Sequence, residues 1–520
     1  MQKNIGVGGF FLPTVYHKDQ KAVAACLDEG KIDYADLTKW GFPDEFMCFV
    51  MQSNLLQFVD STYPNPRVKN EIPVWFLITC QFVMRLHQTG RYNHLRYLLN
   101  AGSILMRFGF NVSNSITGFN DKNEKPRKTI IDADSVRKFF KDTKTTEIRN
   151  WYSKDLQSWF RIQRAFDHHG VFILDQTHLV VPDNPNYKDA VKMPVDEHGQ
   201  LYSNLGSLTM EQKQALIYHR CYTLSTLLNV GVDHELFHVA DYELGPGNED
   251  ELVQAEKMIP DFCCKFPGLI KILILDRGYV DKDFIYKLKH EHQIDVLIPL
   301  RKNMDAYVDA VAIAKAQNNW ETIEQQNEDQ KLISKKEITP VQNIELWSPL
   351  KIHALVTRYT TWNVGLNHYD ENYSVLVSTK KYSIPKMMVT HYDLRVKTEE
   401  RFRQLKRSWY ITDFPSPHAS LVESHVCFTL FTYSLLQLYL RRNDLQQQTR
   451  KMLGTLRNDE NIGINTVLVY TDHCYAVFDL DDYTVRVAKM NETPKQRLIS
   501  IMLAQKEERL KREQANVSVK

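Results

Sequence analysis

The sequence lacks most of the short motifs that identify an enzyme class. It contains no P-loop, no dinucleotide-binding glycine fingerprint and no Gly-x-Ser-x-Gly elbow, so ATP, NAD and serine-hydrolase chemistry have no support. Its eight cysteines form no CxxC pair, which argues against a metal clamp or a disulfide framework and favours a reducing cytoplasm. No run approaches about 18 apolar residues and no signal-peptide pattern is present, so we expect no membrane span.

A strong overall charge is also absent, since the 520 residues carry a net charge of +2. A hydrophobic share of 43% and a charged share of 25% are ordinary for a globular protein, and the length predicts two to four domains. The charge is uneven, because residues 485–520 hold nine Lys or Arg against four Glu. Such basic segments fit an anionic partner such as nucleic acid, or a solvated surface.

The order of apolar segments predicts an α/β fold with four regions. Apolar strands at 170–183, 221–232 and 235–244 precede a strand–helix alternation between 251 and 300, which is typical of a mixed sheet flanked by helices. A meander is expected at 466–488. The regions we predict are a mostly helical N-terminal region, a candidate for DNA binding (1–165), an α/β core (166–301 and 375–443), a β-rich insertion (302–374), and a small α+β tail, a candidate for dimerisation or DNA contact (444–520).

Two aspartates lie at the ends of apolar strands in the predicted core. Asp175 stands in FILDQT and Asp276 in LILDRGY. A carboxylate in such a run is costly unless it has a partner, and the strand ends of α/β sheets are where ligands and metals bind. The alternative for each aspartate is a cap on the following loop or helix.

A third acidic residue lies in the predicted helix 392–406, YDLRVKTEERFRQLK. Tyr392, Arg395, Glu399 and Lys406 follow one another at steps of three, four and seven, which places them within roughly 60° on one helix face. The alternative is a solvated helix whose Arg395–Glu399 pair contributes a few tenths of a kcal/mol. If the three acids converged, their oxygens could hold two divalent cations for displacement at a phosphate.

These residues resemble the DDE transposases of bacterial insertion sequences, which have a ribonuclease-H-like core. The helix matches that family's Y-x2-R-x3-E-x6-K pattern, and residues 276–279 match its strand-end DRG[YF]. The order of two aspartates, a long insertion and a glutamate is also similar. The resemblance covers about residues 165–443.

The resemblance implies specific roles for these residues. Asp175, Asp276 and Glu399 would be the catalytic, metal-binding triad, with two Mg²⁺ ions for which Mn²⁺ can substitute. Contacts with DNA would come from Tyr392, Arg395, Lys406 and Arg277, and base stacking in the insertion from Trp320, Trp347 or Trp362, each of which has burial in the insertion core as its alternative.

The resemblance also implies an activity and partners. The protein would cut DNA at the ends of a mobile element and join the freed 3′-hydroxyl to target DNA. Its partners would be double-stranded DNA with terminal inverted repeats, target DNA and a second copy of the chain. No membrane partner is expected, and the location would be the bacterial cytoplasm, at the nucleoid.

Two other functions remain open from the sequence. A catalytically inactive DNA-binding protein could carry the same scaffold. The other is a zinc metalloprotease, which the pattern His234-Glu235-x-x-His238 indicates because it matches the HExxH motif. Gly231 before this motif and the glycines at 245 and 247 leave little room for a zinc-binding helix, and its residues favour a strand.

Overall fold

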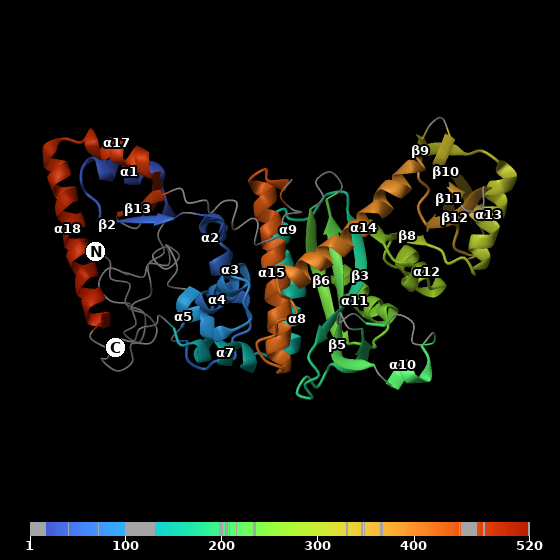
Figure 1. The fold of residues 1–520 in the computed structure, drawn as a ribbon, viewed down its shortest axis with the longest axis horizontal. Helices are drawn as coiled ribbons and strands as arrows, with labels where there is room; N and C mark the ends of the chain where they lie inside the picture. Colours follow the sequence, from blue (N-terminus) through green and yellow to red (C-terminus); the bar gives the residue numbers. More distant parts are fainter. Residues whose placement is uncertain are drawn as a thin grey trace. The chain divides into compact units, whose positions relative to one another are not determined.

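The computed structural model describes residues 17–98 and 131–517, apart from gaps at 40, 71, 197–200, 203–205, 207, 215, 232–235, 329–330, 345–346, 348, 364–367, 447, 449–464 and 472–473. Two compact units share the chain. The first comprises Met1–Ile148, Ser408–Thr432 and Arg450–Lys520, and the second comprises Arg149–Arg407 and Tyr433–Thr449. The ribbon in Figure 1 is coloured along the sequence.

The first unit contains a set of short helices around apolar side chains. In the longest of those near the N-terminus, twelve of thirteen residues are buried, which explains its almost continuous apolar sequence. Residues 94–110 have apolar side chains at helical spacing, and the part of this segment after Leu98 lies outside the described residues. The helices are α1 (Gln20–Asp28), α2 (Phe42–Gln52), α3 (Leu55–Thr62), α4 (Val74–Leu86), α5 (Leu95–Leu98) and α7 (Ala133–Asp142).

A four-stranded sheet in the same unit joins segments far apart in the sequence. Its order is β1-β14-β13-β2, formed by β1 (His17–Lys18), β2 (Tyr34–Lys39), β13 (Asn465–Thr471) and β14 (Cys474–Asp479). The predicted meander at 466–488 is wrong in its last part. Residues Leu480–Ala488 form helix α17, which begins with Asp481 and Asp482 in its first turn, where the helix dipole favours acidic residues. Helix α18 (Glu492–Val517) follows it.

The second unit is built on one mixed sheet of ten strands, as the sequence predicted. Its order is β4-β5-β3-β7-β8-β12-β11-β10-β9, with β6 paired to β5. Strand β3 pairs in parallel with β7 and β7 in parallel with β8, whereas β3–β5 and β5–β6 are antiparallel. This is the ribonuclease-H-like arrangement expected. The core strands are β3 (Val171–Val181), β4 (Val191–Val195), β5 (Ile217–Val230), β6 (Phe237–Pro246), β7 (Ile272–Ile274) and β8 (Asp295–Pro299).

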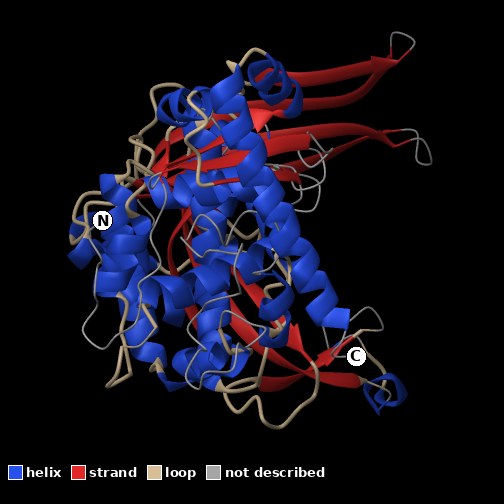
Figure 2. Ribbon diagram, turned by 90° about the vertical axis from the view of Figure 1, so that its left-hand side faces the viewer, coloured by secondary structure: helices blue, strands red, loops and turns tan. Residues whose placement is uncertain are grey.

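The segment predicted as an insertion continues this sheet. Strand β12 (His368–Ser378) pairs antiparallel with β8, and the long strands of this segment are visible in red in Figure 2. Helix α13 (Asp305–Gln317) packs against β10, β11 and β12. The other strands are β9 (Glu321–Glu328), β10 (Lys331–Ile344) and β11 (Ile352–Asn363).

Helices complete the second unit. Helix α11 (Glu251–Lys265) begins after the N-cap Asp250, whose side chain accepts a hydrogen bond from the Leu252 N–H. Helix α14 (Lys386–Arg407) contacts β3, β7 and β8 (Figure 1). The remaining helices of this unit are a π-helical turn (Trp151–Leu156), α9 (Gln157–Ile162), α10 (Met210–Gln214), a 3₁₀ turn η4 (Arg277–Tyr279) and α12 (Lys282–His290). Helix α8 (Thr145–Asn150) includes the residues at which the first unit ends and the second begins.

Helix α15 (Ala419–Arg442) has the length and apolar composition of a membrane span. Of its most apolar window, 94% is buried inside the protein. The burial explains this composition, because a buried helix can be apolar on every side.

Candidate active site

The parallel pairing of β3 with β7 brings the two strand-end aspartates to neighbouring positions. Ile173 pairs with Ile274 in that register, and Asp175 and Asp276 each follow two residues later. Side chains alternate between the two faces of a strand, so residues two positions after Ile173 and Ile274 lie on one face of the sheet. Both carboxylates therefore point toward the same face. Asp175 is 7% exposed, and its Oδ1 accepts a hydrogen bond from the Gln176 N–H at 3.0 Å.

Asp276 lies where β7 gives way to the 3₁₀ turn η4. Its Oδ1 accepts a hydrogen bond from the Arg277 N–H at 2.7 Å, so the aspartate caps that turn. The apolar run at 269–279 favours a strand by its composition, but it forms one only over Ile272–Ile274. Asp276 therefore has the capping role that was the alternative for each aspartate. Its second carboxylate oxygen, Oδ2, faces a different partner.

That partner is Arg395 of α14, which connects the three acidic residues. Its Nη2 lies 3.1 Å from Asp276 Oδ2 and 3.7 Å from Asp175 Oδ1, and its Nη1 lies 3.8 Å from Glu399 Oε1. The side chain of Arg395 is only 14% exposed, whereas that of Glu399 is 70% exposed. The structure thus gathers Asp175, Asp276 and Glu399 around one guanidinium.

Helix α14 is not the solvated surface helix of the alternative interpretation. Its buried face includes Met388, Leu394, Phe402 and Leu405. The Arg395–Glu399 pair of that interpretation is present, but the same arginine also reaches two strands of the sheet. Packing of the apolar face on the sheet holds the polar face at the ends of β3 and β7.

Burial controls the protonation of the first aspartate. It raises the pKa of Asp175 to about 6, while the nearby Arg395 and the hydrogen bond from Gln176 oppose that rise. Asp276 and Glu399 add to it, since like charges disfavour ionisation. For Arg395, burial alone would lower the pKa, but Asp175 and Asp276 raise it above the usual value. The guanidinium therefore stays charged and offsets part of the negative charge.

The predicted DNA-contacting residues do not all lie together. Burial raises the pKa of Tyr392 to about 12, and the charges that act on it are those of Arg395, Asp276, Asp175 and Arg277, so it belongs to the same group. Arg277 is exposed directly beside Asp276.

Lys406 lies elsewhere, near Cys221 and His178, where burial lowers its pKa. Its place on the helix face is as predicted. Seven residues, however, advance about 10 Å along a helix, which carries Lys406 past the end of β7 toward β5.

The three tryptophans lie in the insertion and differ in their surroundings. Trp320 and Trp347 pack against the main hydrophobic core, and the Arg358 guanidinium lies 4.4 Å from the Trp320 ring. Trp362 is half-buried in β11 with its ring 4.8 Å from that of Tyr369, in an edge-to-face arrangement. Of the three, Trp362 has the surroundings that best fit contact with a base.

One acidic residue that the sequence analysis did not select also faces this group. Glu251, the first residue of α11, has its pKa raised by burial and then by Asp276 and Asp175. Its signal in the sequence is weak, because an acidic residue in the first turn of a helix is common.

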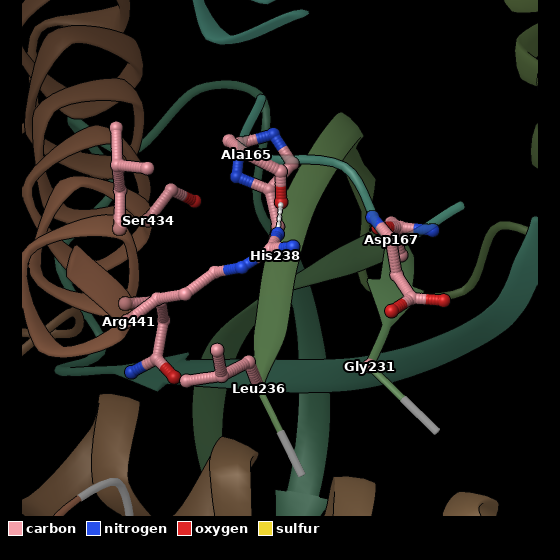
Figure 3. A pocket seen from close by; sticks show the side chains of 10 residues that line it. Ala165, Asp167, Gly231, Leu236, His238, Ser434 and Arg441 are labelled. Atoms are coloured by element: carbon pink, nitrogen blue, oxygen red, sulfur yellow. Dashed lines mark hydrogen bonds between the residues drawn. The ribbon is translucent and has the colours of Figure 1, made fainter. Parts of the chain in front are cut away.

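The last two residues of the HExxH motif, Phe237 and His238, lie in a strand rather than in a helix. His234 and Glu235 lie outside the described residues, and His238 belongs to strand β6. His238 is 3% exposed, its Nε2 lies 2.9 Å from Gln157 Oε1, and burial lowers its pKa to about 3. It lines a small cavity with Asp167, Ser434 and Arg441 (Figure 3). The zinc protease is therefore unsupported.

The acidic group has the ligands that hard divalent cations prefer. Its donors are carboxylate oxygens, which suit Mg²⁺ and Mn²⁺ rather than zinc. The fold already places a cation among them, since Arg395 Nη2 lies within 3.7 Å of both aspartates and its Nη1 lies 3.8 Å from Glu399. These residues fit a divalent metal. Among the described residues, the group with three metal-ligand atoms mutually within 4.8 Å is Asp167, His168 and His169 before β3, and the three carboxylates around Arg395 are not so closely grouped.

Comparison with known proteins agrees with this geometry. The model of the family described as "Transposase DDE domain" matches residues 166–435, just over half of the chain, and spans β3, β7, the insertion and α14. No curated protein sequence matches the chain. With its mixed sheet, its strand-end aspartates and this match, the chain belongs to the family of transposase DDE domains.

Proposed function

We propose that this transposase cleaves phosphodiester bonds at the ends of a mobile element and joins the freed 3′-hydroxyl to target DNA. The observation that carries the proposal is the convergence of Asp175, Asp276 and Glu399 within 3.8 Å of the Arg395 guanidinium. Family membership supports a transposase in general, and the carboxylate group supports this chemistry in particular.

In this proposal the three carboxylates hold the metal and Arg395 organises them. When bound, a pair of Mg²⁺ or Mn²⁺ ions would supply activation of a water and stabilisation of the leaving oxygen. Water oxygen adds to phosphorus, the bond from phosphorus to the 3′-oxygen breaks, and that oxygen takes a proton. The new 3′-hydroxyl then attacks a phosphate of target DNA in the same manner.

The residues around the carboxylates have distinct tasks in this scheme. Asp175 must lose its proton to bind a cation, and Arg395 favours the charged form. Arg395 and Tyr392 lie beside the carboxylates, where they can contact a phosphate at the cut position. Arg277 is placed for the same contact. Lys406, beside His178, is suited to a phosphate farther along the DNA.

Partners and location follow from this activity. The substrates would be double-stranded DNA with terminal inverted repeats and a target duplex, and two ends held together imply a homodimer on DNA. We expect the protein in the bacterial cytoplasm, at the nucleoid.

The test is Mn²⁺-dependent nicking of the element's own end sequences by the full chain. Glu399→Gln should lower the nicking rate at least about 100-fold, because loss of a metal ligand removes several kcal/mol of transition-state stabilisation. The matched control is Glu400→Gln, whose carboxylate accepts from Arg403 Nε at 2.7 Å on the same helix and should keep wild-type activity.

Full activity in the Glu399→Gln variant would remove Glu399 from the proposed site. Wild-type protein that binds end DNA yet never nicks it in Mn²⁺ would instead identify an inactive DNA-binding protein on this scaffold.

A further inference from the structure

Glu251 is held at the carboxylate group by the start of α11. Its position is fixed first by the Asp250 cap, whose Oδ1 accepts from the Leu252 N–H at 2.8 Å. It is fixed again one turn later by Gln254, which is buried. The Gln254 amide donates to Thr223 Oγ1 at 2.9 Å and accepts from Gln176 Nε2 at 3.1 Å. Gln176 directly follows Asp175, so the first turn of α11 is connected to the strand that carries the first aspartate.

The Glu251 carboxylate lies directly against the turn that follows the second aspartate. A Cβ added at Gly278 would lie 1.3 Å from Glu251 Oε1 and 2.4 Å from its carboxylate carbon. Only glycine leaves this space free, two residues after Asp276. In the described part of the chain, no hydrogen bond or ion pair of the Glu251 carboxylate is found, and the opposing charge that lowers its pKa is that of Arg301.

A second polar group lies at the same place. Tyr279 is fully buried, and no described residue meets the distance and angle of a hydrogen bond with its hydroxyl. Ser225 is the hydrogen-bonding neighbour that lowers the pKa of Tyr279, and Ser225 donates its own proton to Gln254. The charges that act on Tyr279 are those of Glu251, Asp175 and Asp276. A buried hydroxyl that feels three carboxylates and makes no hydrogen bond of normal geometry is a group that a ligand bound beside it would satisfy.

We propose that Glu251 is a fourth carboxylate ligand of the divalent metal site, and that Gly278 is glycine so that this carboxylate can reach it. The inference rests on the proposed function, because the metal site is that of the proposed nuclease. Four carboxylates with one nearby arginine carry more negative charge than a single cation offsets, which suits a pair of divalent ions. Tyr279 would then donate to an oxygen ligand of this site.

The test measures Mn²⁺ binding to the full chain by titration calorimetry, without DNA. Glu251→Gln should weaken binding of at least one ion by about 10- to 100-fold, the scale found for supporting residues of metal sites. Gly278→Ala should weaken Mn²⁺ binding to a similar extent, since the added Cβ displaces the Glu251 carboxylate without removing its charge. Glu256→Gln, a surface change in the same helix where Glu256 pairs with Lys287 at 3.6 Å, should bind as wild type.

Thermal unfolding in EDTA separates a ligand from a merely structural residue. Glu251→Gln should unfold at the wild-type temperature or above, because a like charge is removed beside Asp276. Wild-type Mn²⁺ affinity in this variant, or a lowered unfolding temperature in EDTA, overturns the inference. Asp276→Asn distinguishes the two proposals. If both Asp276→Asn and Glu251→Gln bind Mn²⁺ with wild-type affinity, the proposed metal site itself is wrong. If Asp276→Asn loses binding and Glu251→Gln does not, only the role of Glu251 is wrong.

Discussion

Arg395→Gln should destabilise the metal-free protein, because Arg395 is the cation that holds three carboxylates together. Its distances of 3.1 Å to Asp276 and 3.7 Å to Asp175 correspond to about 5 kcal/mol of attraction each at an effective dielectric constant of 20. Desolvation of the largely buried guanidinium offsets much of this. The exposed Glu399 contributes little. Removing the guanidinium from this buried group of charges should lower the free energy of unfolding by about 3 kcal/mol.

Divalent cations should restore most of this loss. An ion that binds only the folded protein stabilises it by about 2.7 kcal/mol at 100 times its dissociation constant. Mn²⁺ would replace the lost positive charge between the same carboxylates. The difference between Arg395→Gln and wild type should therefore be large in EDTA and small in saturating Mn²⁺.

The destabilisation should also depend on pH. Arg395 lowers the pKa of Asp175, so in its absence that pKa rises further above about 6. A carboxyl group whose folded pKa is raised binds more protons in the folded state, so stability increases as pH falls through that pKa. The deficit of Arg395→Gln should consequently be smaller at pH 5.5 than at pH 8.

The assay is thermal and urea unfolding of the full chain in EDTA and in Mn²⁺. Arg403→Gln is the control, because Arg403 pairs on the surface of the same helix with Glu400 and its loss should cost at most about 1 kcal/mol. An unchanged unfolding free energy for Arg395→Gln in EDTA would refute the reasoning. So would an equal deficit with and without Mn²⁺.

Two further predictions concern the first aspartate and the tryptophans. Asp175→Asn should abolish Mn²⁺-dependent nicking yet raise the unfolding free energy in EDTA at pH 8 by about 1–3 kcal/mol. The reason is that burial raises the pKa of the Asp175 carboxyl to about 6 and so favours its neutral form. A lower stability of this variant in urea unfolding would contradict the prediction. Trp320→Ala should cost about 3 kcal/mol of stability, since its ring packs on the core, whereas Trp362→Ala should leave stability within about 1 kcal/mol and weaken end-DNA binding by about 1–3 kcal/mol in a fluorescence titration. Equal DNA binding by Trp362→Ala and wild type would remove the stacking role.

Much of the fold is encoded locally, which is why it was predictable. The apolar run at 170–183 forms β3, the alternating segments after it form α11, α12 and β8, and the helix around Glu399 exists. Side-chain periodicity and apolar runs act over a few residues, so one sequence suffices to recognise them. The meander at 466–488 failed in its second half, where β-branched residues near Val485 lie in a helix that packs on β13 and β14.

The sequence by itself determined the candidates for the site: two aspartates at strand ends and a glutamate one turn after an arginine. Only the tertiary structure decided which of them meet. The parallel register of β3 and β7 matches Asp175 with Asp276, and the packing of α14 on the sheet puts Arg395 between them. The same packing carries Lys406 toward Cys221, and the capped start of α11 brings Glu251 to Gly278. These outcomes depend on strand register and on distance along a helix axis, which the spacing of residues in a sequence does not contain.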